Sequence, residues 1–234
     1  IEAKVRVIDC VGFMVDGAAG HVENGEERLV KTPWFDYDIP FTQAAEIGTR
    51  KVINDHSTIG IVVTTDGTIG EIKRPGYIAA EKQTIDELKK LGKPFVVLLN
   101  STKPYSDETA RLAREMSESY GVSVLPVNCE QLKKEDVFHI LERVLKEFPV
   151  TEMDFHIPKW LEILPSTHWL KAPVIQVARN VIQKVTHMKD VSGELEQQHT
   201  DTIRSMNVKN MQMADGRVGV QVDMDDSYYY PVSY

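Results

Sequence analysis

The sequence predicts an α/β protein in which helices cover both faces of a parallel β-sheet, forming three layers. Two observations predict this class: continuous apolar runs of strand length, such as residues 95–99, and the amphipathic helical segments between them. The chain has 234 residues, 42% of them hydrophobic, which is enough for one or two domains. We expect the α/β order over residues 1–150 and, after Pro149, an α+β segment over residues 151–234.

The elements of the first region follow from apolar periodicity and from residues typical of helix ends. Residues 4–8 alternate basic and apolar side chains, which predicts a strand that ends at Asp9. Residues 13–39 are rich in Gly, Glu and Asp and predict an insertion or a mobile loop. The further predicted elements are a helix over 40–54, a strand over 58–65, a helix over 79–91, a strand over 95–100, a helix over 107–120, a strand over 122–127 and a helix over 134–148. Gly92 and Gly121 are typical of helix ends.

The second region has a different pattern. It predicts an extended piece over residues 153–157 and a helix over 174–188 that resumes as far as residue 204. Alternating runs then flank Asp215-Gly216, which is typical of a two-residue hairpin turn. This turn would place Met213 opposite Val218 and Met211 opposite Val220, giving one apolar face. Either the same domain covers that face, or the hairpin edge accepts a strand from another copy.

Composition excludes several function classes. The formal net charge of -8 argues against nucleic acid as the main partner. The longest apolar runs are far shorter than the roughly 20 residues of a membrane span. Cys10 and Cys129 lack metal-ligand spacing, which favours inert thiols in a reducing cytosol. The chain begins at Ile1, directly before a strand-like stretch, and we interpret this as a start inside a domain.

Candidate site residues follow the predicted strands, because ligands of open parallel sheets lie beyond the carboxyl ends of the strands. Asp9 ends one strand and Gly12 follows it. A carboxylate at this position can organise the water shell of Mg²⁺, and a glycine lets the backbone amide approach a terminal phosphate. The alternative is an Asp turn that needs a glycine with positive φ.

Two other strand ends carry polar loops. Residues 64–70 could cradle phosphate, although no helix begins directly after them, and Asp66-Gly67 is also typical of a plain turn. Asn100 can read a nucleobase edge, brace a neighbouring loop or form a turn before Pro104. The motif G-x-x-x-x-G-K-[ST] does not occur in the chain. We therefore expect these 234 residues to be unable to hydrolyse nucleotide alone.

Several segments together closely resemble the stage IV sporulation protein A family, the morphogenetic ATPases of the spore coat in endospore-forming bacteria. They are Val7–Gly12, Thr32–Trp34, Ala44–Ile53, His56–Gly60, Thr64–Gly70, Gly92–Phe95 and Asn100. The likeness runs through about Trp169 and is thinner beyond it. It implies a P-loop NTPase domain of the translation-factor GTPase class, lacking its N-terminal phosphate loop here and followed by part of a middle or assembly domain.

The resemblance also implies an activity. Members of this family hydrolyse ATP with Mg²⁺, polymerise on the forespore surface in the mother-cell cytoplasm and form the basement layer of the coat. Asp9 matches the family's Walker B aspartate, which contacts Mg²⁺ through water, and Gly12 matches its switch glycine. The implied partners are further copies of the protein, the small membrane-bound peptide SpoVM, and coat proteins such as SpoVID or SipL.

Two departures from ordinary GTPases have physical consequences. A guanine-reading N-K-x-D motif needs a carboxylate acceptor, whereas after Asn100 this chain has Lys103, which can only donate. We therefore expect Asn100 and Lys103 to serve a base other than guanine. Phe13 follows Gly12 where signalling GTPases often have a water-positioning Gln. The alternatives to an ATP-driven scaffold are a conventional GTPase switch and an interaction module that works without nucleotide.

Overall fold

The computed structural model describes residues 6–198, 200–213 and 215–228. The chain divides into two compact units, Ile1–Val144 and Leu145–Tyr234, and each is described by itself. In the described residues no helix is both long enough and apolar enough to cross a membrane.

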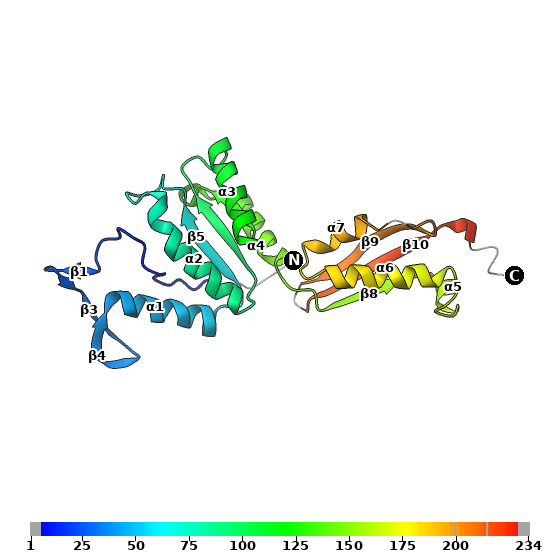
Figure 1. Ribbon diagram of the computed structural model, residues 1–234, viewed down its shortest axis with the longest axis horizontal. Helices are drawn as coiled ribbons and strands as arrows, with labels where there is room; N and C mark the ends of the chain where they lie inside the picture. Colours follow the sequence, from blue (N-terminus) through cyan, green and yellow to red (C-terminus); the bar gives the residue numbers. More distant parts are fainter. Residues whose placement is uncertain (1–5, 199, 214, 229–234) are drawn as a thin grey trace. The chain divides into compact units, whose positions relative to one another are not determined.

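The first unit is built on a parallel three-stranded sheet in the order β5-β6-β7 (Figure 1). Its strands are β5 Gly60–Thr65, β6 Phe95–Asn100 and β7 Val124–Val127. The pairing is in simple parallel register, with Gly60 beside Phe95 and Thr65 beside Asn100. The predicted α/β class and parallel sheet are therefore confirmed. All three strands point their carboxyl ends to the same edge.

Helices connect the strands as the sequence predicts, with shifted ends. They are α1 Phe41–Lys51, the π-helix η1 Val52–His56, α2 Arg74–Lys90, α3 Asp107–Tyr120, the 3-10 helix η2 Cys129–Gln131, and α4 Lys134–Lys146. The bounds of α3 match the prediction because both ends are marked. Ser106 accepts a hydrogen bond from the amide of Thr109, and Gly121 adopts φ 60°. Helix α2 begins earlier than predicted because Pro75 opens its first turn.

The sheet is covered unequally. Val62, Val97 and Leu99 face one side and pack with apolar residues of α2 and α3. On the other side Val96 and Leu98 are buried, yet their β5 neighbours Ile61 and Val63 are 44% and 58% exposed. Across the described residues, the expectation of helices over both faces therefore fails at β5.

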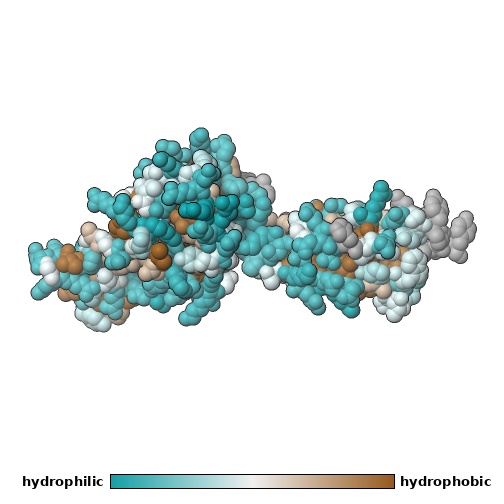
Figure 2. Space-filling model, turned by 45° about the horizontal axis from the view of Figure 1, so that its top comes forward, coloured by the Kyte–Doolittle hydropathy of each residue, from teal (hydrophilic) through white to brown (hydrophobic). Residues whose placement is uncertain are grey.

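A small β-rich arm replaces the loop predicted for residues 13–39 (Figure 1). It contains two short antiparallel pairs, β1 Val22–Glu23 with β2 Glu26–Glu27, and β3 Leu29–Thr32 with β4 Phe35–Pro40. The first turn is Asn24-Gly25, with φ values of 55° and 84°. Both positive angles are typical of a tight hairpin turn, so Asn-Gly was the sequence signal for this pair. In Figure 2 the surface is mostly hydrophilic, with a hydrophobic patch on this arm.

The strand predicted over residues 4–8 is wrong in its described part. Residues 6–11 have no regular structure and are exposed; Val7 is 88% exposed. The alternating pattern is suited to a strand, but a strand needs a hydrogen-bonded neighbour, and no described segment pairs with it. Residues 4 and 5 lie outside the described ranges.

The second unit is a three-stranded sheet with helices on one face. Its strands are β8 Glu152–His156, β9 Ile203–Gln212 and β10 Arg217–Met224, in the order β8-β10-β9. Its helices are α5 Lys159–Glu162, α6 Lys171–Lys184, α7 Asp190–Glu196 and the 3-10 helix η3 Asp226–Tyr228. Strand β10 pairs parallel to β8 and antiparallel to β9. The predicted resumption of helix after residue 188 is confirmed as far as Glu196 by α7 and is wrong beyond it, because β9 begins at Ile203.

The predicted hairpin exists in a different register. Val218 lies opposite Met211, and Val220 lies opposite Val208. Met213 therefore belongs to the connecting loop, which is longer than two residues, and has no strand partner. The β10 residues Val218, Val220 and Val222 are fully buried in one core with Val177 and Val191 of the helices. Of the two alternatives for the apolar face, cover by the same domain is the one observed.

Candidate functional site

The candidate site lies at the carboxyl edge of the parallel sheet, where a turn follows β5. The carboxylate of Asp66 accepts hydrogen bonds from the amide of Thr68 at 2.9 Å and from its hydroxyl at 2.6 Å. The amide of Gly67 donates to the hydroxyl of Thr65 at 3.1 Å. A Cβ on Gly67 would lie 2.6 Å from the amide nitrogen of Arg74, so only glycine lets this turn approach α2. Asp66-Gly67 is therefore a hydrogen-bonded turn.

Asp66 is held as a carboxylate. Burial favours its neutral form, but hydrogen bonds from Ser101, Thr68 and Thr109 outweigh burial and lower the pKa of Asp66 below its usual value. Ser101 is fully buried, and its hydroxyl lies 3.3 Å from that of Thr109. The charge of Asp66 is thus surrounded by hydroxyl groups.

Hydrogen bonds join the loops after the three strands. The amide of Asp66 donates to the carbonyl of Asn100 at 3.3 Å. The side-chain oxygen of Asn100 accepts from the amide of Cys129 at 2.9 Å, in the loop after β7. The amide of Thr102 donates to the hydroxyl of Thr68 at 3.0 Å. Among the roles considered for Asn100, the structure shows it bracing a neighbouring loop.

Lys103 lies beside a hollow at the same edge. Its backbone amide donates to the hydroxyl of Ser101 at 3.0 Å, and its side chain is exposed. The hollow has a volume of ≈ 400 Å³ and runs between the loops that follow β6 and β7. It is lined by Thr102, Lys103, Pro104, Tyr105, Ser106, Pro126, Val127, Asn128, Gln131, Leu132, Lys133 and Asp136. Tyr105, one of the lining residues, is 90% exposed.

Among the described residues, no hydrogen bond or ion pair joins Asp9 or Gly12 to these loops. The Asp9 carboxylate accepts from the amide of its neighbour Cys10 at 2.9 Å, and its side chain is exposed. Gly12 has φ 85°, which only glycine adopts without strain. Phe13 is 7% exposed and packs into the core of the first unit, with the guanidinium of Arg50 5.9 Å from its ring centre. Core packing explains a Phe at this position.

The described residues offer only part of what a Mg²⁺ ion needs. Within residues 6–198, 200–213 and 215–228 no three His, Cys, Asp or Glu side chains gather as a metal site. Mg²⁺ usually keeps several waters and uses one or two carboxylates together with substrate phosphates. The exposed Asp9 carboxylate fits one water-mediated contact of that kind. The remaining ligands of such an ion would be waters and substrate phosphates.

A buried ion pair beneath the site was missed by the sequence analysis. Arg74 donates to both oxygens of Glu81, at 2.6 and 2.8 Å, and to the hydroxyl of Thr64 at 3.2 Å. Tyr120 donates to Glu81 at 2.8 Å. Burial favours the neutral form of Glu81, but hydrogen bonds from Arg74, Thr64 and Tyr120 outweigh burial and lower the pKa of Glu81. Burial and the neighbouring Glu81 carboxylate raise the pKa of Tyr120 to about 12. Arg74 and Glu81 are seven residues apart and therefore lie on the same face of α2, which was the available sequence signal.

Comparison with known proteins gives the family. Residues 1–149 match the model of the stage IV sporulation protein A ATPase domain, and residues 150–233 match that of its middle domain. The chain belongs to the stage IV sporulation protein A family. This confirms the resemblance stated from the sequence, and it makes the first unit an ATPase domain of that family.

Curated relatives agree with this assignment. Stage IV sporulation protein A of Clostridioides difficile (strain 630) is 41% identical over 233 residues, covering 99% of this chain and 48% of the relative. The Bacillus subtilis (strain 168) protein of that name is 38% identical over 230 residues, 98% of this chain and 47% of the relative. The chain thus spans about half the length of these relatives. No solved structure matches it.

Proposed function

We propose that the whole protein is an ATP-hydrolysing scaffold that assembles with its own copies on the forespore surface, as the basement layer of the spore coat. Nucleotide binding is supported by one observation: hydrogen bonds of Asn100 and Asp66 join three loops at one edge of the sheet, beside a hollow. Parallel sheets bind ligands at this edge. The family match supports ATP as the nucleotide.

The proposal includes a P-loop NTPase fold of the GTPase-like class. The free side of β5 supports it. Ile61 and Val63 are exposed there although their β6 neighbours are buried, so the sheet presents apolar surface to a further strand and helix. The relatives are about twice as long as this chain and have residues enough for such elements and for a phosphate loop. The 234 residues alone are expected to be inactive.

Within this proposal the residues have separate roles. Asp9 contacts Mg²⁺ through water, and Mg²⁺ offsets phosphate charge during hydrolysis. Gly12 brings its backbone amide to the terminal phosphate. Asn100 holds the loop after β7 in place. Lys103 lies beside the nucleotide base, where its ammonium group can donate hydrogen bonds but cannot accept them.

Assembly contacts are assigned to residues 151–234, but not to the apolar hairpin face, because α6 and α7 cover it. Among the described residues no strand pairs with the outer side of β9, and this side and the polar sheet face remain as surfaces for another copy. The membrane-bound peptide SpoVM and coat proteins such as SpoVID or SipL stay proposed partners of the whole protein.

The test uses the full-length protein and its Asp9→Ala variant. Loss of the Mg²⁺-organising carboxylate should lower ATP turnover by roughly two orders of magnitude and leave the thermal unfolding midpoint unchanged, because Asp9 packs against nothing in the core. Asp16→Ala, which removes a nearby exposed carboxylate, is the matched control. Near-parental hydrolysis by a folded Asp9→Ala protein would overturn the assigned role.

A further inference from the structure

Asp66 lies next to the hollow of the first unit without forming part of its wall. The hollow runs between the loops after β6 and β7, and Asp66 is not among the described residues that line it. The carboxylate instead accepts hydrogen bonds from hydroxyl groups, and the other partners of these hydroxyls are residues of the wall. Three short chains of hydrogen bonds therefore lead from Asp66 to the hollow.

The first chain runs through Thr68. Its hydroxyl donates to the carboxylate of Asp66 at 2.6 Å, and the same oxygen accepts from the amide of Thr102 at 3.0 Å. A hydroxyl has one proton and two lone pairs, so the bond to the carboxylate uses the proton and leaves the oxygen to accept. Thr102 lines the hollow. Asp66 thus orients the backbone of Thr102 through one hydroxyl.

Two more chains start at the same carboxylate. The fully buried Ser101 bonds to Asp66 through its hydroxyl, and its oxygen accepts from the amide of Lys103 at 3.0 Å. The hydroxyl of Thr109 donates to Asp66 at 3.5 Å, and its oxygen lies 2.9 Å from the hydroxyl of Ser106. Lys103 and Ser106 both line the hollow. One acceptor therefore orders three residues of the wall.

A carboxylate suits this position because it can only accept. Each hydroxyl points its proton at Asp66, and its oxygen then receives a proton from a residue of the wall. An Asn side chain would also donate from its NH₂ group, and this donor would compete for the hydroxyl oxygens. The direction of the hydrogen bonds, and not only the shape of the side chain, therefore depends on Asp66.

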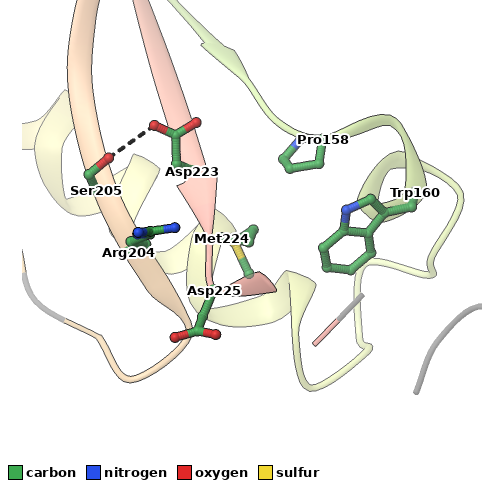
Figure 3. A pocket seen from close by; sticks show the side chains of 7 residues that line it. All are labelled: Pro158, Trp160, Arg204, Ser205, Asp223, Met224 and Asp225. Carbon is green, nitrogen blue, oxygen red and sulfur yellow. Dashed lines mark hydrogen bonds between the residues drawn. The ribbon is translucent and has the colours of Figure 1, made fainter. Parts of the chain in front are cut away.

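The second unit contains a hollow that is built differently (Figure 3). Its volume is ≈ 430 Å³, and its carboxylates are part of the wall. Asp223 accepts from the hydroxyl of Ser205 at 3.0 Å. Figure 3 shows Asp225 pointing away from Trp160, with Met224 between them. In the first unit, by contrast, the carboxylate acts on the wall from outside it.

We propose that Asp66 is a positioning residue for nucleotide binding. Through the hydroxyls of Thr68, Ser101 and Thr109 it holds residues 102–106 in the shape that the base of the nucleotide meets. This inference rests on the proposed function, because it places the base in the hollow. It also gives the two aspartates different effects. Asp9 acts on turnover through Mg²⁺, whereas Asp66 acts on affinity.

The first experiment compares the full-length protein with its Asp66→Asn variant, which has nearly the same size and changes the direction of the hydrogen bonds. We expect KM for ATP to rise about tenfold while kcat changes by less than about twofold, because the base is held equally in the ground state and the transition state. Affinity for ADP, measured by calorimetry, should fall by the same factor and does not depend on turnover.

Asp107→Asn is the matched control, because it removes an exposed carboxylate close to the same loop and outside the wall. It should leave KM, kcat and the affinity for ADP unchanged. An Asp66→Asn protein with parental KM and parental affinity for ADP would overturn the proposal. An equal loss of affinity in Asp107→Asn would also overturn it, since any nearby charge would then suffice.

The second experiment uses the 234-residue chain without nucleotide, so it tests the hydrogen bonds apart from the proposed function. Thr68→Val should speed solvent exchange of the Thr102 amide roughly tenfold, measured by NMR, and leave the Lys103 amide unchanged. Thr68→Ser keeps the hydroxyl and should restore slow exchange. Asp66→Asn should speed exchange at both amides.

The two experiments separate the possible failures. Parental exchange at both amides in Asp66→Asn would show that the carboxylate does not hold the loop, whatever the nucleotide does. Faster exchange with unchanged affinity for ADP would show that the loop is held for another purpose, and the positioning role would be wrong. A full-length parent that binds neither ATP nor ADP would refute the proposed function and this inference with it.

Discussion

Arg74 donates two hydrogen bonds, of 2.6 and 2.8 Å, to the carboxylate of Glu81, whose side chain is only 1% exposed. Arg74 is the first residue of α2, and its guanidinium also reaches Thr64 at the end of β5. The pair therefore fixes the helix to the strand that leads into the Asp66 turn.

Removing one partner of this pair should be costly. We expect Arg74→Met to lower the free energy of unfolding by about 3 kcal/mol, because it leaves the Glu81 charge buried without its partner. Lys82→Met is the matched control, since Lys82 and Asp86 form an exposed pair on the same helix and should contribute less than about 1 kcal/mol. Urea unfolding measures both. Equal losses in the two variants would show that the buried pair has no special role.

The same pair predicts how stability changes in acid. The folded pKa of Glu81 lies below its ordinary value of 4.5, so its contribution is present above that pH and is lost as the pH falls through the folded value. The pKa of Asp66 is lowered too, and it acts in the same direction. We expect the free energy of unfolding to fall more steeply below about pH 5 in the parent than in Glu81→Gln. Parallel pH profiles of the two proteins would contradict this.

Asn100 offers a test of the braced loops. Asn100→Ala leaves the amide of Cys129 without its acceptor and should cost about 1 kcal/mol. Asn100→Asp keeps an acceptor oxygen at the same position and should restore most of that loss. Hydrogen exchange at Cys129 reports the bond directly. Exchange should be faster in Asn100→Ala only; unchanged exchange in that variant would rule out the brace.

Lys103 tests the choice of base in the full-length protein. We expect ATP to be hydrolysed in preference to GTP, and Lys103→Asp to raise GTP turnover by restoring an acceptor for guanine. Lys133→Asp, at another position on the hollow, controls for the change of charge. A parent protein that uses GTP faster than ATP at equal concentration would contradict the prediction.

The sequence predicted those parts of the fold whose signals are local. Helix α3 was predicted to the residue, because Ser106 and Gly121 mark its ends. The parallel sheet followed from apolar runs such as β6, which is almost wholly buried. The strand predicted before Asp9 failed because pairing is a property of two segments, and alternation in one segment cannot supply the other.

The candidate site was predicted in part for the same reason. Asn100 and Lys103 were found because they follow a clear strand, but their partners lie in other loops. The hydrogen bond from Cys129 to Asn100 joins residues that are 29 positions apart in the sequence. The hydrogen bond from Tyr120 to Glu81 joins residues that are 39 positions apart. The hairpin register failed because the connection between Gln212 and Arg217 is longer than two residues, which places Val218 opposite Met211. A bulge at Lys209, which alternation does not show, then places Val220 opposite Val208.

Val220 provides the last prediction, because the two alternatives for the apolar hairpin face differ in what a charge there would do. If the face were open for assembly, Val220→Lys would alter only assembly. In the structure Val220 is fully buried in a core with α6 and α7, and a lysine there would lack a partner for its charge. We expect Val220→Lys to lower the free energy of unfolding by more than about 3 kcal/mol in the 234-residue chain, where assembly of the whole protein plays no part. Asn207→Lys, an exposed residue of β9, should change it by less than about 0.5 kcal/mol. A Val220→Lys protein as stable as Asn207→Lys would mean that this face is open after all.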